Sequence, residues 1–204
     1  MSNARRQPIV AGIHALTDDE LVSAIRVGNL TGLGTLFDRH GTSVRRLLLR
    51  LGVAPRDVDD LVQDTFLDCI VAAPTYQSGL SVRSWLFGIA VRTVAIRFQK
   101  RTRQRWLRFM APEEVPEIAT ELPEAGLGEA LRDVYAILRG MDADERIALV
   151  LHRVDGLSLE AAASAASTSL ATYRRRLARA ETKFFARAAS RPALQSWIAE
   201  GSES

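Results

Sequence analysis

The sequence predicts an all-α protein made of two small helical domains joined by a flexible linker. Apolar residues recur at the three- and four-residue spacing of a buried helix face along most of the chain, and no segment alternates as a strand does. A stretch rich in glutamate and proline interrupts that pattern near the middle. Of the 204 residues, 47% are hydrophobic, which is enough to form a core.

Charge is segregated along the chain. The formal net charge is only +3, but residues 69–112 contain eight lysines or arginines and no acid, whereas residues 113–129 contain six glutamates and no base. Basic segments can bind nucleic acid, and an acidic segment between them would be repelled by the same partner. We therefore expect nucleic-acid-binding surfaces separated by an acidic linker.

Composition excludes several functional classes. The single cysteine, Cys69, cannot form an internal disulfide or an all-cysteine zinc site. His14, His40 and His152 lie far apart without metal-ligand spacing, so we expect no metal and no cofactor. No segment has about twenty consecutive apolar residues, and the N-terminus lacks the apolar core of a signal peptide. The sequence therefore predicts a cytoplasmic protein.

The first two helices are expected after a mobile tail. Residues 1–14 lack helical periodicity. Thr17 and Glu20 have the spacing of a capping box, which predicts a short helix that ends before Gly28. A second helix is expected over residues 30–51, ended by Gly52. Its predicted inward residues are Leu33, Phe37, Val44, Leu47, Leu48 and Leu51.

A helix from Pro55 to Ala73 is expected to have one apolar and one acidic face. Its predicted buried residues are Val58, Leu61, Val62, Thr65, Cys69 and Ile70. The other face carries Asp57, Asp60, Gln63, Asp64 and Asp68. Carboxylates can bind metals or transfer protons, but no histidine or nucleophile accompanies them. We interpret the acidic face as a docking surface for a basic helix of another protein.

A loop and a long helix follow. Residues 74–80 have the composition of a loop, and Ser81 is placed to cap the next helix. Its predicted inward residues are Val82, Trp85, Leu86, Ile89, Thr93 and Ile96. Its far end carries Arg97, Lys100, Arg101, Arg103, Arg105 and Arg108. These cations predict contact with a polyanion, where Trp106 and Phe109 would either stack on unpaired bases or pin the helix end to its neighbours.

The linker is expected over residues 109–126, after which helices resume. One helix is expected over residues 129–139, and another after Asp142, which has capping-box spacing to Glu145. The predicted inward residues of these two helices are Leu131, Val134, Tyr135, Leu138, Ile147, Val150, Leu151 and Val154.

Residues 158–181 predict two short helices with a tight turn between them. The second begins near Ser169 and has an inward stripe of Leu170, Tyr173, Leu177, Ala180 and Phe184. Its opposite face and flanks carry Thr168, Ala171, Thr172, Arg174, Arg175, Arg176, Ala178 and Arg179. Small residues allow close approach to base edges and arginines reach guanines and phosphates, as in a helix-turn-helix. The alternative is a solvated basic face.

Four motifs in order resemble the extracytoplasmic-function group of bacterial RNA polymerase sigma factors, in the sigma-70 family. Asp57-Val-Asp-Asp-Leu-Val-Gln-Asp-Thr-Phe66 and Trp85-Leu-Phe-Gly-Ile-Ala90 resemble motifs of sigma region 2. Asp155-Gly-Leu-Ser-Leu-Glu160 and Thr172-Tyr-Arg-Arg-Arg-Leu-Ala-Arg-Ala180 resemble motifs of region 4. The resemblance implies region 2 at residues 15–108 and region 4 at residues 127–198.

The chain departs from the family pattern at four positions. Arg92 stands where the family usually has asparagine, and Ser167 where it has the glycine of the region 4 turn. Tyr173 replaces a common valine of the recognition helix, and Ala161 replaces the second glutamate of a pair. These differences affect the expected promoter preference and leave the expected fold unchanged.

The resemblance implies a protein without a catalytic centre that binds core RNA polymerase and promoter DNA. Polymerase binding is expected at Asp57, Asp60, Gln63 and Asp64. The candidate DNA-binding residues are Tyr76, Arg83, Arg97, Lys100, Arg101, Thr168, Thr172, Arg174, Arg175, Arg176 and Arg179. Tyr76 would stack on a flipped base of the −10 element, or else pack over the helix end. The recognition helix would read the −35 element.

Regulation is expected to come from outside the chain or from contact between its domains. Family members are commonly held inactive by an anti-sigma factor. The DNA-binding faces are expected to be partly masked, by such a partner or by packing that brings residues 113–129 near the arginines of the long helix. The rival interpretation is a helix-turn-helix regulator whose helical N-terminal half senses a ligand or dimerises. A small helical enzyme would need a nucleophile and base that the sequence does not supply.

Overall fold

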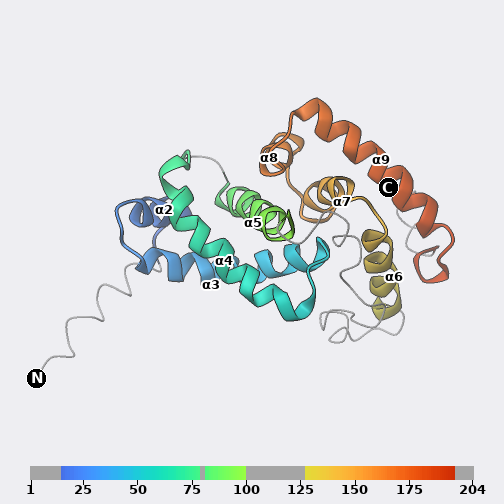
Figure 1. Ribbon diagram of the computed structural model, residues 1–204, viewed down its shortest axis with the longest axis horizontal. Coiled ribbons are helices and arrows are strands. Elements are labelled where there is room, and N and C mark those ends of the chain that lie inside the picture. Colours follow the sequence, from blue (N-terminus) through green and yellow to red (C-terminus); the bar gives the residue numbers. More distant parts are fainter. Residues whose placement is uncertain (1–14, 79–80, 100–126, 196–204) are drawn as a thin grey trace, which may run out of the picture.

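The computed structural model describes residues 15–78, 81–99 and 127–195, and every regular element within them is helical (Figure 1). The N-terminal unit consists of α2 (Asp18–Arg26), α3 (Thr31–Arg50), α4 (Pro55–Ala72), the short 3-10 turn η1 (Ala73–Thr75) and α5 (Val82–Gln99). The C-terminal unit consists of α6 (Leu127–Arg139), α7 (Ala143–Leu149), the π-helical turn η4 (Val150–Val154), α8 (Leu159–Ala165) and α9 (Leu170–Ala188). The predicted all-α fold with two helical units is confirmed.

The N-terminal unit forms around α3, α4 and α5, which pack against one another. The predicted capping box starts α2: the Thr17 hydroxyl accepts a hydrogen bond from the Glu20 amide, and the Glu20 carboxylate accepts one from the Thr17 amide. Cys69 is fully buried in this core, and burial raises the pKa of its thiol to about 12. The interpretation of Cys69 as a core thiol is confirmed.

The C-terminal unit contains the predicted helix-turn-helix, α8 and α9. The Ser158 hydroxyl accepts a hydrogen bond from the Ala161 amide and starts α8, and the Ser169 hydroxyl does the same for Thr172 at α9. Tyr173 is fully buried and donates from its hydroxyl to the Ala148 carbonyl at 2.7 Å, which fixes α9 against α7. The pair is therefore held by caps at both helix starts and a buried hydrogen bond.

Several details of the sequence interpretation are wrong. Asp142 precedes α7, but its side chain does not cap that helix, because Asp142 and Glu145 both bind the ammonium of Lys183 from α9. Three apolar residues predicted to face inward are exposed: Phe37, Ile96 and Val154. Val154 lies at the end of the π-helical turn, whose wider winding rotates it away from the face that a regular α-helix would bury.

The two units share one hydrophobic core. Buried residues of α2–α5 and of α6–α9 form one large contiguous cluster, beside a small separate one of Ala130, Ile137, Ala188 and Leu194, and α5 packs against α8 (Figure 1). The predicted linker at residues 109–126 and the basic helix end beyond Gln99 lie outside the described residues. No described helix is long and apolar enough to cross a membrane.

Candidate nucleic-acid interface

Helix α9 presents an open basic face. Its inward residues Tyr173, Leu177 and Ala180 are buried, as predicted, and this leaves the opposite side of the helix to solvent. Arg174, Arg175 and Arg179 are exposed on that side, and none forms an ion pair with the described part of the chain. Guanidinium groups without protein partners are available to base edges and phosphates.

The other predicted residues of α9 are less accessible. Arg176 is half-buried and its guanidinium lies 2.6 Å from the Asp144 carboxylate. Thr168 and Thr172 are half-buried at the start of the helix, and the Thr172 hydroxyl accepts a hydrogen bond from Ser169 at 3.0 Å. The exposed basic face of α9 is thus narrower than the sequence indicated. At its centre lie Arg174, Arg175 and Arg179, which have no ion pair with the described residues.

The turn before α9 is strained at Ser167. This residue has φ of +50°, the left-handed region that favours glycine, and the family pattern has glycine at this position. Its conformation is held by hydrogen bonds from the Ser167 amide to Ser164 and from the Thr168 amide to Ala163. The serine therefore occupies a backbone conformation imposed by the turn.

We expect Ser167→Gly to raise the free energy of unfolding. The left-handed conformation costs a non-glycine residue about 1–3 kcal/mol, and the greater flexibility of unfolded glycine offsets about 0.5–1 kcal/mol of the gain, leaving a net stabilisation of about 1 kcal/mol. Urea unfolding of the purified variant measures this difference. Ser164→Gly, in the regular part of α8, is the matched control and should destabilise the protein. A destabilised Ser167→Gly variant would show that the turn is not strained.

The arginines of α5 that the sequence assigns to DNA have protein partners. Arg83 donates to the Asp155 carbonyl at 2.9 Å and lies over the Phe87 ring, 4.8 Å from its centroid. Arg97 lies 2.6 Å from the Asp64 carboxylate and 3.7 Å from Asp60. Lys100 and Arg101, together with the aromatic pair Trp106 and Phe109, lie outside the described residues. In this structure both described arginines would have to exchange protein contacts for phosphate contacts.

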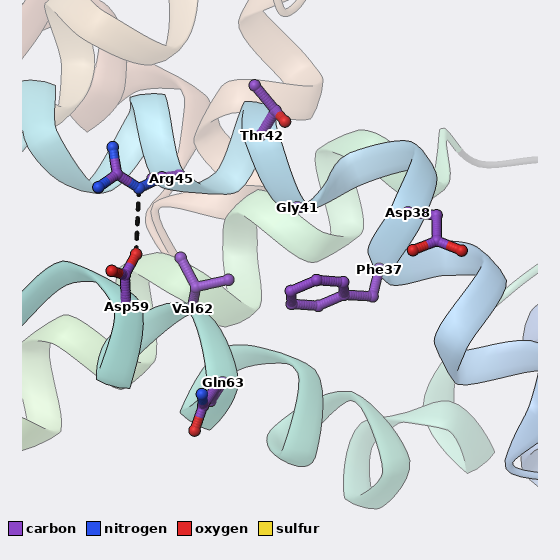
Figure 2. Close-up of a pocket in the computed structure, with 8 residues that line it drawn as sticks. All are labelled: Phe37, Asp38, Gly41, Thr42, Arg45, Asp59, Val62 and Gln63. Atoms are coloured by element: carbon purple, nitrogen blue, oxygen red, sulfur yellow. Dashed lines mark hydrogen bonds and ion pairs between the residues drawn. The ribbon is translucent and has the colours of Figure 1, made fainter. Parts of the chain in front are cut away.

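The acidic face predicted for α4 is partly occupied by α5. Asp60 and Asp64 face Arg97 of α5. Asp68 accepts a hydrogen bond from Thr93, which also belongs to α5. Asp57 is half-buried near the helix start. Gln63 lines the edge of the groove between α3 and α4 (Figure 2). Of the four residues expected to bind polymerase, Asp60 and Asp64 thus already have a cationic neighbour, and polymerase binding at this face stays a prediction.

A groove of about 550 Å³ separates α3 from α4 (Figure 2). Its floor is apolar, because the Phe37 ring lies in it and packs edge-on against Phe66, with ring centroids 5.1 Å apart. One end is closed by the ion pair between Arg45 and Asp59, at 3.1 Å. The residues that line it are Phe37, Asp38, Gly41, Thr42, Arg45, Asp59, Val62 and Gln63. The unexpected exposure of Phe37 is explained by this groove.

The solvent face of α4 also carries large apolar side chains. Leu67 is 59% exposed and Val71 is 79% exposed, one helical turn apart. Large apolar side chains gathered on an open helix face are typical of an interaction surface.

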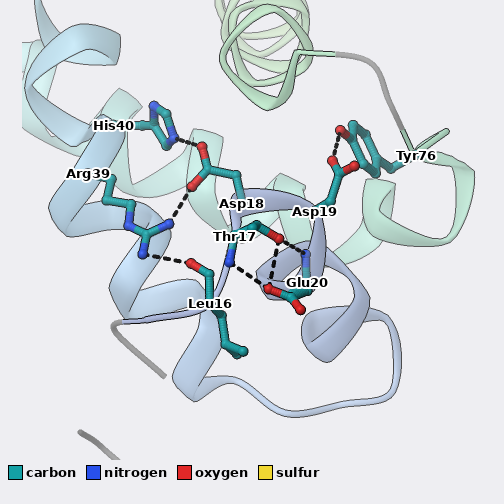
Figure 3. A network of polar contacts seen from close by, with 8 residues as sticks. All are labelled: Leu16, Thr17, Asp18, Asp19, Glu20, Arg39, His40 and Tyr76. Atoms are coloured by element: carbon teal, nitrogen blue, oxygen red, sulfur yellow. Dashed lines mark hydrogen bonds and ion pairs between the residues drawn. The ribbon is translucent and has the colours of Figure 1, made fainter. Parts of the chain in front are cut away.

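Tyr76 is packed in this structure, which is the second of the two roles expected for it. Its ring is buried against Trp85, with ring centroids 5.0 Å apart, and its hydroxyl donates to Asp19 at 2.5 Å (Figure 3). Burial and the neighbouring carboxylate both raise the pKa of this phenol. Arg26 holds the same segment by donating to the Tyr76 and Ala73 carbonyls. Tyr76 thus fastens the end of α4 to α2, which is the packed alternative.

A second network fastens the start of α2 to α3. The Asp18 carboxylate binds Arg39 at 2.7 Å and His40 at 2.6 Å, and Arg39 also donates to the Leu16 carbonyl (Figure 3). Partial burial raises the pKa of Asp18, but the bonds from Arg39 and His40 outweigh it and lower the pKa overall. The Arg39 guanidinium of this cluster is bound to the Asp18 carboxylate and the Leu16 carbonyl, and the cluster is structural.

Sequence reasoning missed the polar residues that join the two units. Arg50 of α3 and Asp155, after η4, form an ion pair at 2.7 Å although they are far apart in sequence. Arg146 of α7 is buried and donates to the Leu51 carbonyl at 2.8 Å. The only sequence feature that indicated contact between the two units was that α5 is apolar on nearly all sides. Such a pattern is typical of a helix covered by more than one neighbour.

Comparison with known families matches both halves of the chain. Residues 36–104 match the model of sigma-70 region 2, and residues 131–184 match the model of sigma-70 region 4. A solved structure of CnrH in complex with the cytosolic domain of CnrY is similar, with a TM-score of 0.59 and 26% identity over 83% of this chain and 95% of that chain. The sigma factor RpoE of Bartonella quintana, solved with the anti-sigma factor NepR, has the same TM-score at 22% identity, over 73% and 91% of the two chains, and supports the fold.

Relatives with a similar sequence agree with these matches. The RNA polymerase sigma factor NccH of Alcaligenes xylosoxydans xylosoxydans is 31% identical over 83% of this chain and 93% of its own length. The ECF RNA polymerase sigma factor SigC of Mycobacterium tuberculosis is 32% identical over 83% of this chain and 92% of its own length. The chain belongs to the extracytoplasmic-function group of the sigma-70 family of RNA polymerase sigma factors.

Proposed function

We propose that this sigma factor directs transcription initiation by binding core RNA polymerase through α4 and promoter DNA through α9 and α5. The open arginine face of α9 carries this proposal. It combines a capped, internally fixed helix with three cations that have no ion-pair partner within the described ranges. The protein acts in the cytoplasm by binding, and its contribution to initiation is positioning rather than covalent chemistry.

In this proposal, α9 reads the −35 element as duplex DNA. The exposed side of α9 carries Ala171 and Ala178 between the arginines, so the helix can approach the floor of the major groove. Arg175 is assigned to base edges and Arg179 to phosphate. The ion pair with Asp144 holds the Arg176 guanidinium at the side of α9. There Arg176 stabilises the helix and contacts the DNA only at the edge of the interface.

The −10 element is assigned to α5 and the loop before it. Arg83, Arg97, Lys100 and Arg101 would follow the backbone of the separated strand, and residues 74–80 would receive a flipped base. Because Tyr76 is packed on Trp85, base capture would use the loop backbone and the exposed residues Gln77 and Ser78 instead. The proposed domains are region 2 at residues 15–108 and region 4 at residues 127–198, with the linker between them.

An anti-sigma factor is the proposed regulatory partner. CnrH and the Bartonella quintana RpoE, both of this fold, were solved in complexes, CnrH with CnrY and RpoE with the anti-sigma factor NepR. A partner that covers α4 or α9 of this chain would block the surfaces assigned above to polymerase and DNA.

Reconstitution with core RNA polymerase tests the function. The purified chain should co-migrate with core enzyme, and the complex should start transcripts at defined positions on a genomic fragment library, whereas core alone should not. A helix-turn-helix regulator, the rival class, would bind duplex DNA without core and would produce no new start sites. That second pattern would overturn the assignment.

A further inference from the structure

The loop proposed to receive a flipped base is described over residues 74–78 and is held at Tyr76 in three ways. The Tyr76 ring lies against Trp85 of α5, with ring centroids 5.0 Å apart. The Tyr76 hydroxyl donates to the Asp19 carboxylate at 2.5 Å (Figure 3). The Tyr76 carbonyl accepts from the Arg26 guanidinium at 2.7 Å. The ring, the hydroxyl and the backbone of this one residue therefore each have a separate partner.

Two of the three partners belong to α2. Asp19 lies in the first turn of this helix and Arg26 is its last residue, so α2 holds the loop from both of its ends. Arg26 also donates to the Ala73 carbonyl at 3.2 Å, and α2 packs against η1. The apolar side of α2 is buried in the core of the N-terminal unit. The loop is therefore attached to a helix that is itself fixed.

The residues that follow Tyr76 are open to solvent. Gln77 and Ser78 are both exposed, and they are the side chains proposed to meet the flipped base. Consecutive Cα atoms are about 3.8 Å apart, so neither residue lies more than about 8 Å from the Cα of Tyr76. The place and direction of the chain at Gln77 thus depend on the contacts that hold Tyr76.

We propose that α2, through Asp19 and Arg26, positions this loop to receive an unpaired base of the −10 strand. The proposal rests on the proposed function, which assigns base capture to the loop. Asp19 and Arg26 act through Tyr76 and do not touch the DNA, so both are positioning residues. Helix α2 thereby has a part in promoter binding although it lies outside α5 and α9.

Holding the loop before the DNA arrives strengthens binding of the flipped base. Extraction of a base from its stack is unfavourable, and a loop that must also become ordered on binding adds a further entropic cost. Freeing the backbone of a single residue is enough to weaken binding by about tenfold. This effect is confined to the base that the loop receives, because the cations of α5 are assigned to the phosphates of the strand.

Three variants release the loop from α2. Arg26→Ala removes the donor to the Tyr76 and Ala73 carbonyls. Asp19→Ala removes the acceptor of the Tyr76 hydroxyl. Tyr76→Phe breaks the same hydrogen bond from the other side and keeps a ring against Trp85. The last two variants should therefore have similar effects.

Asp18→Ala is the matched control for Asp19→Ala. Both carboxylates lie in the first turn of α2, so each substitution removes the same charge from the positive end of the helix. The Asp18 carboxylate binds Arg39 and His40 of α3 instead of the loop. Asp18→Ala should lower the free energy of unfolding at least as much as Asp19→Ala does, while the loop stays in place.

Binding of single-stranded DNA to the complex of the full-length protein with core RNA polymerase measures the positioning. The probe is the −10 segment of the non-template strand of a promoter found by start-site mapping, either intact or with an abasic site at each position in turn. The intact wild-type complex should bind the intact strand about 10- to 100-fold more tightly than the strand that is abasic at the captured position. This ratio should fall about threefold to tenfold in each of the three variants and stay unchanged in Asp18→Ala. A general loss of structure would instead weaken both strands equally.

Hydrogen exchange of the free full-length protein tests the support itself. Amide exchange over residues 73–78 should be about threefold to tenfold faster in Arg26→Ala and Asp19→Ala than in the wild type, and unchanged in Asp18→Ala. Unchanged exchange in both variants would overturn the role of α2 as the support of the loop. Faster exchange with an unchanged ratio of intact to abasic binding would overturn its role in base capture, as would an equal fall of that ratio in Asp18→Ala. A protein that starts no transcripts with core polymerase would overturn the proposed function, and the exchange result would still decide whether α2 holds the loop.

Discussion

Replacing Arg174, Arg175 and Arg179 together by alanine is expected to lower the affinity for −35 duplex DNA by at least about 100-fold, since each base or phosphate contact contributes about 1–3 kcal/mol. All three side chains are exposed and free of ion pairs with the described residues, so the folded protein should lose little stability. Fluorescence anisotropy with labelled promoter duplex measures the loss. The melting temperature should stay within a few degrees of the parent.

The single variants distinguish base reading from phosphate binding. Arg175→Ala should relax the preference at one base pair, whereas Arg179→Ala should weaken all sequences equally and reduce the salt dependence by about one charge. Arg176→Ala is the control, because the Arg176 guanidinium is already bound to Asp144. Of the four single arginine variants of α9, it should lower the affinity for duplex DNA least. Equal losses from Arg175→Ala on every duplex would remove its base-reading role.

The local elements were predictable because local chemistry decides them. Thr17 and Glu20 form the expected capping box, Ser169 starts α9, and the stripe through Tyr173 and Leu177 is buried. Each of these features depends on residues within one or two helical turns, where side-chain hydrogen bonds and helical periodicity act directly. The helix-turn-helix and its exposed arginines were therefore visible in the sequence.

Tertiary partners were not predictable in the same way. Asp142 has capping-box spacing, yet Lys183 from α9 takes its carboxylate, and Tyr76 has a loop position, yet Asp19 and Trp85 bury it. Asp60 and Asp64 follow helical spacing, but their solvent face is partly occupied by Arg97. In each case a residue far away in sequence competes for the side chain, and periodicity carries no information about that competitor.

The contacts of the α4 acids with α5 change which residues should bind polymerase. Asp60 and Asp64 already lie beside Arg97, so their charge is partly neutralised before any partner arrives. Leu67 and Val71, by contrast, are large, apolar and exposed on the same helix. Apolar side chains that a partner covers contribute more to affinity than exposed charges at the rim of an interface.

We therefore expect Leu67→Ser with Val71→Ser to weaken binding to core RNA polymerase by about 100-fold or more, because covering each side chain contributes about 1.5–3 kcal/mol. Both residues are mostly exposed in the free protein, so the free energy of unfolding should change by less than about 0.5 kcal/mol per substitution. Asp60→Asn with Asp64→Asn is the matched comparison on the same helix and should weaken binding less, while lowering its salt dependence. Titration of fluorescently labelled protein with core enzyme measures both pairs, with −35 duplex binding as the check that region 4 is intact. A larger loss from the aspartate pair than from the apolar pair would show that polymerase docks on the carboxylates beside Arg97, with the apolar strip of α4 outside the interface.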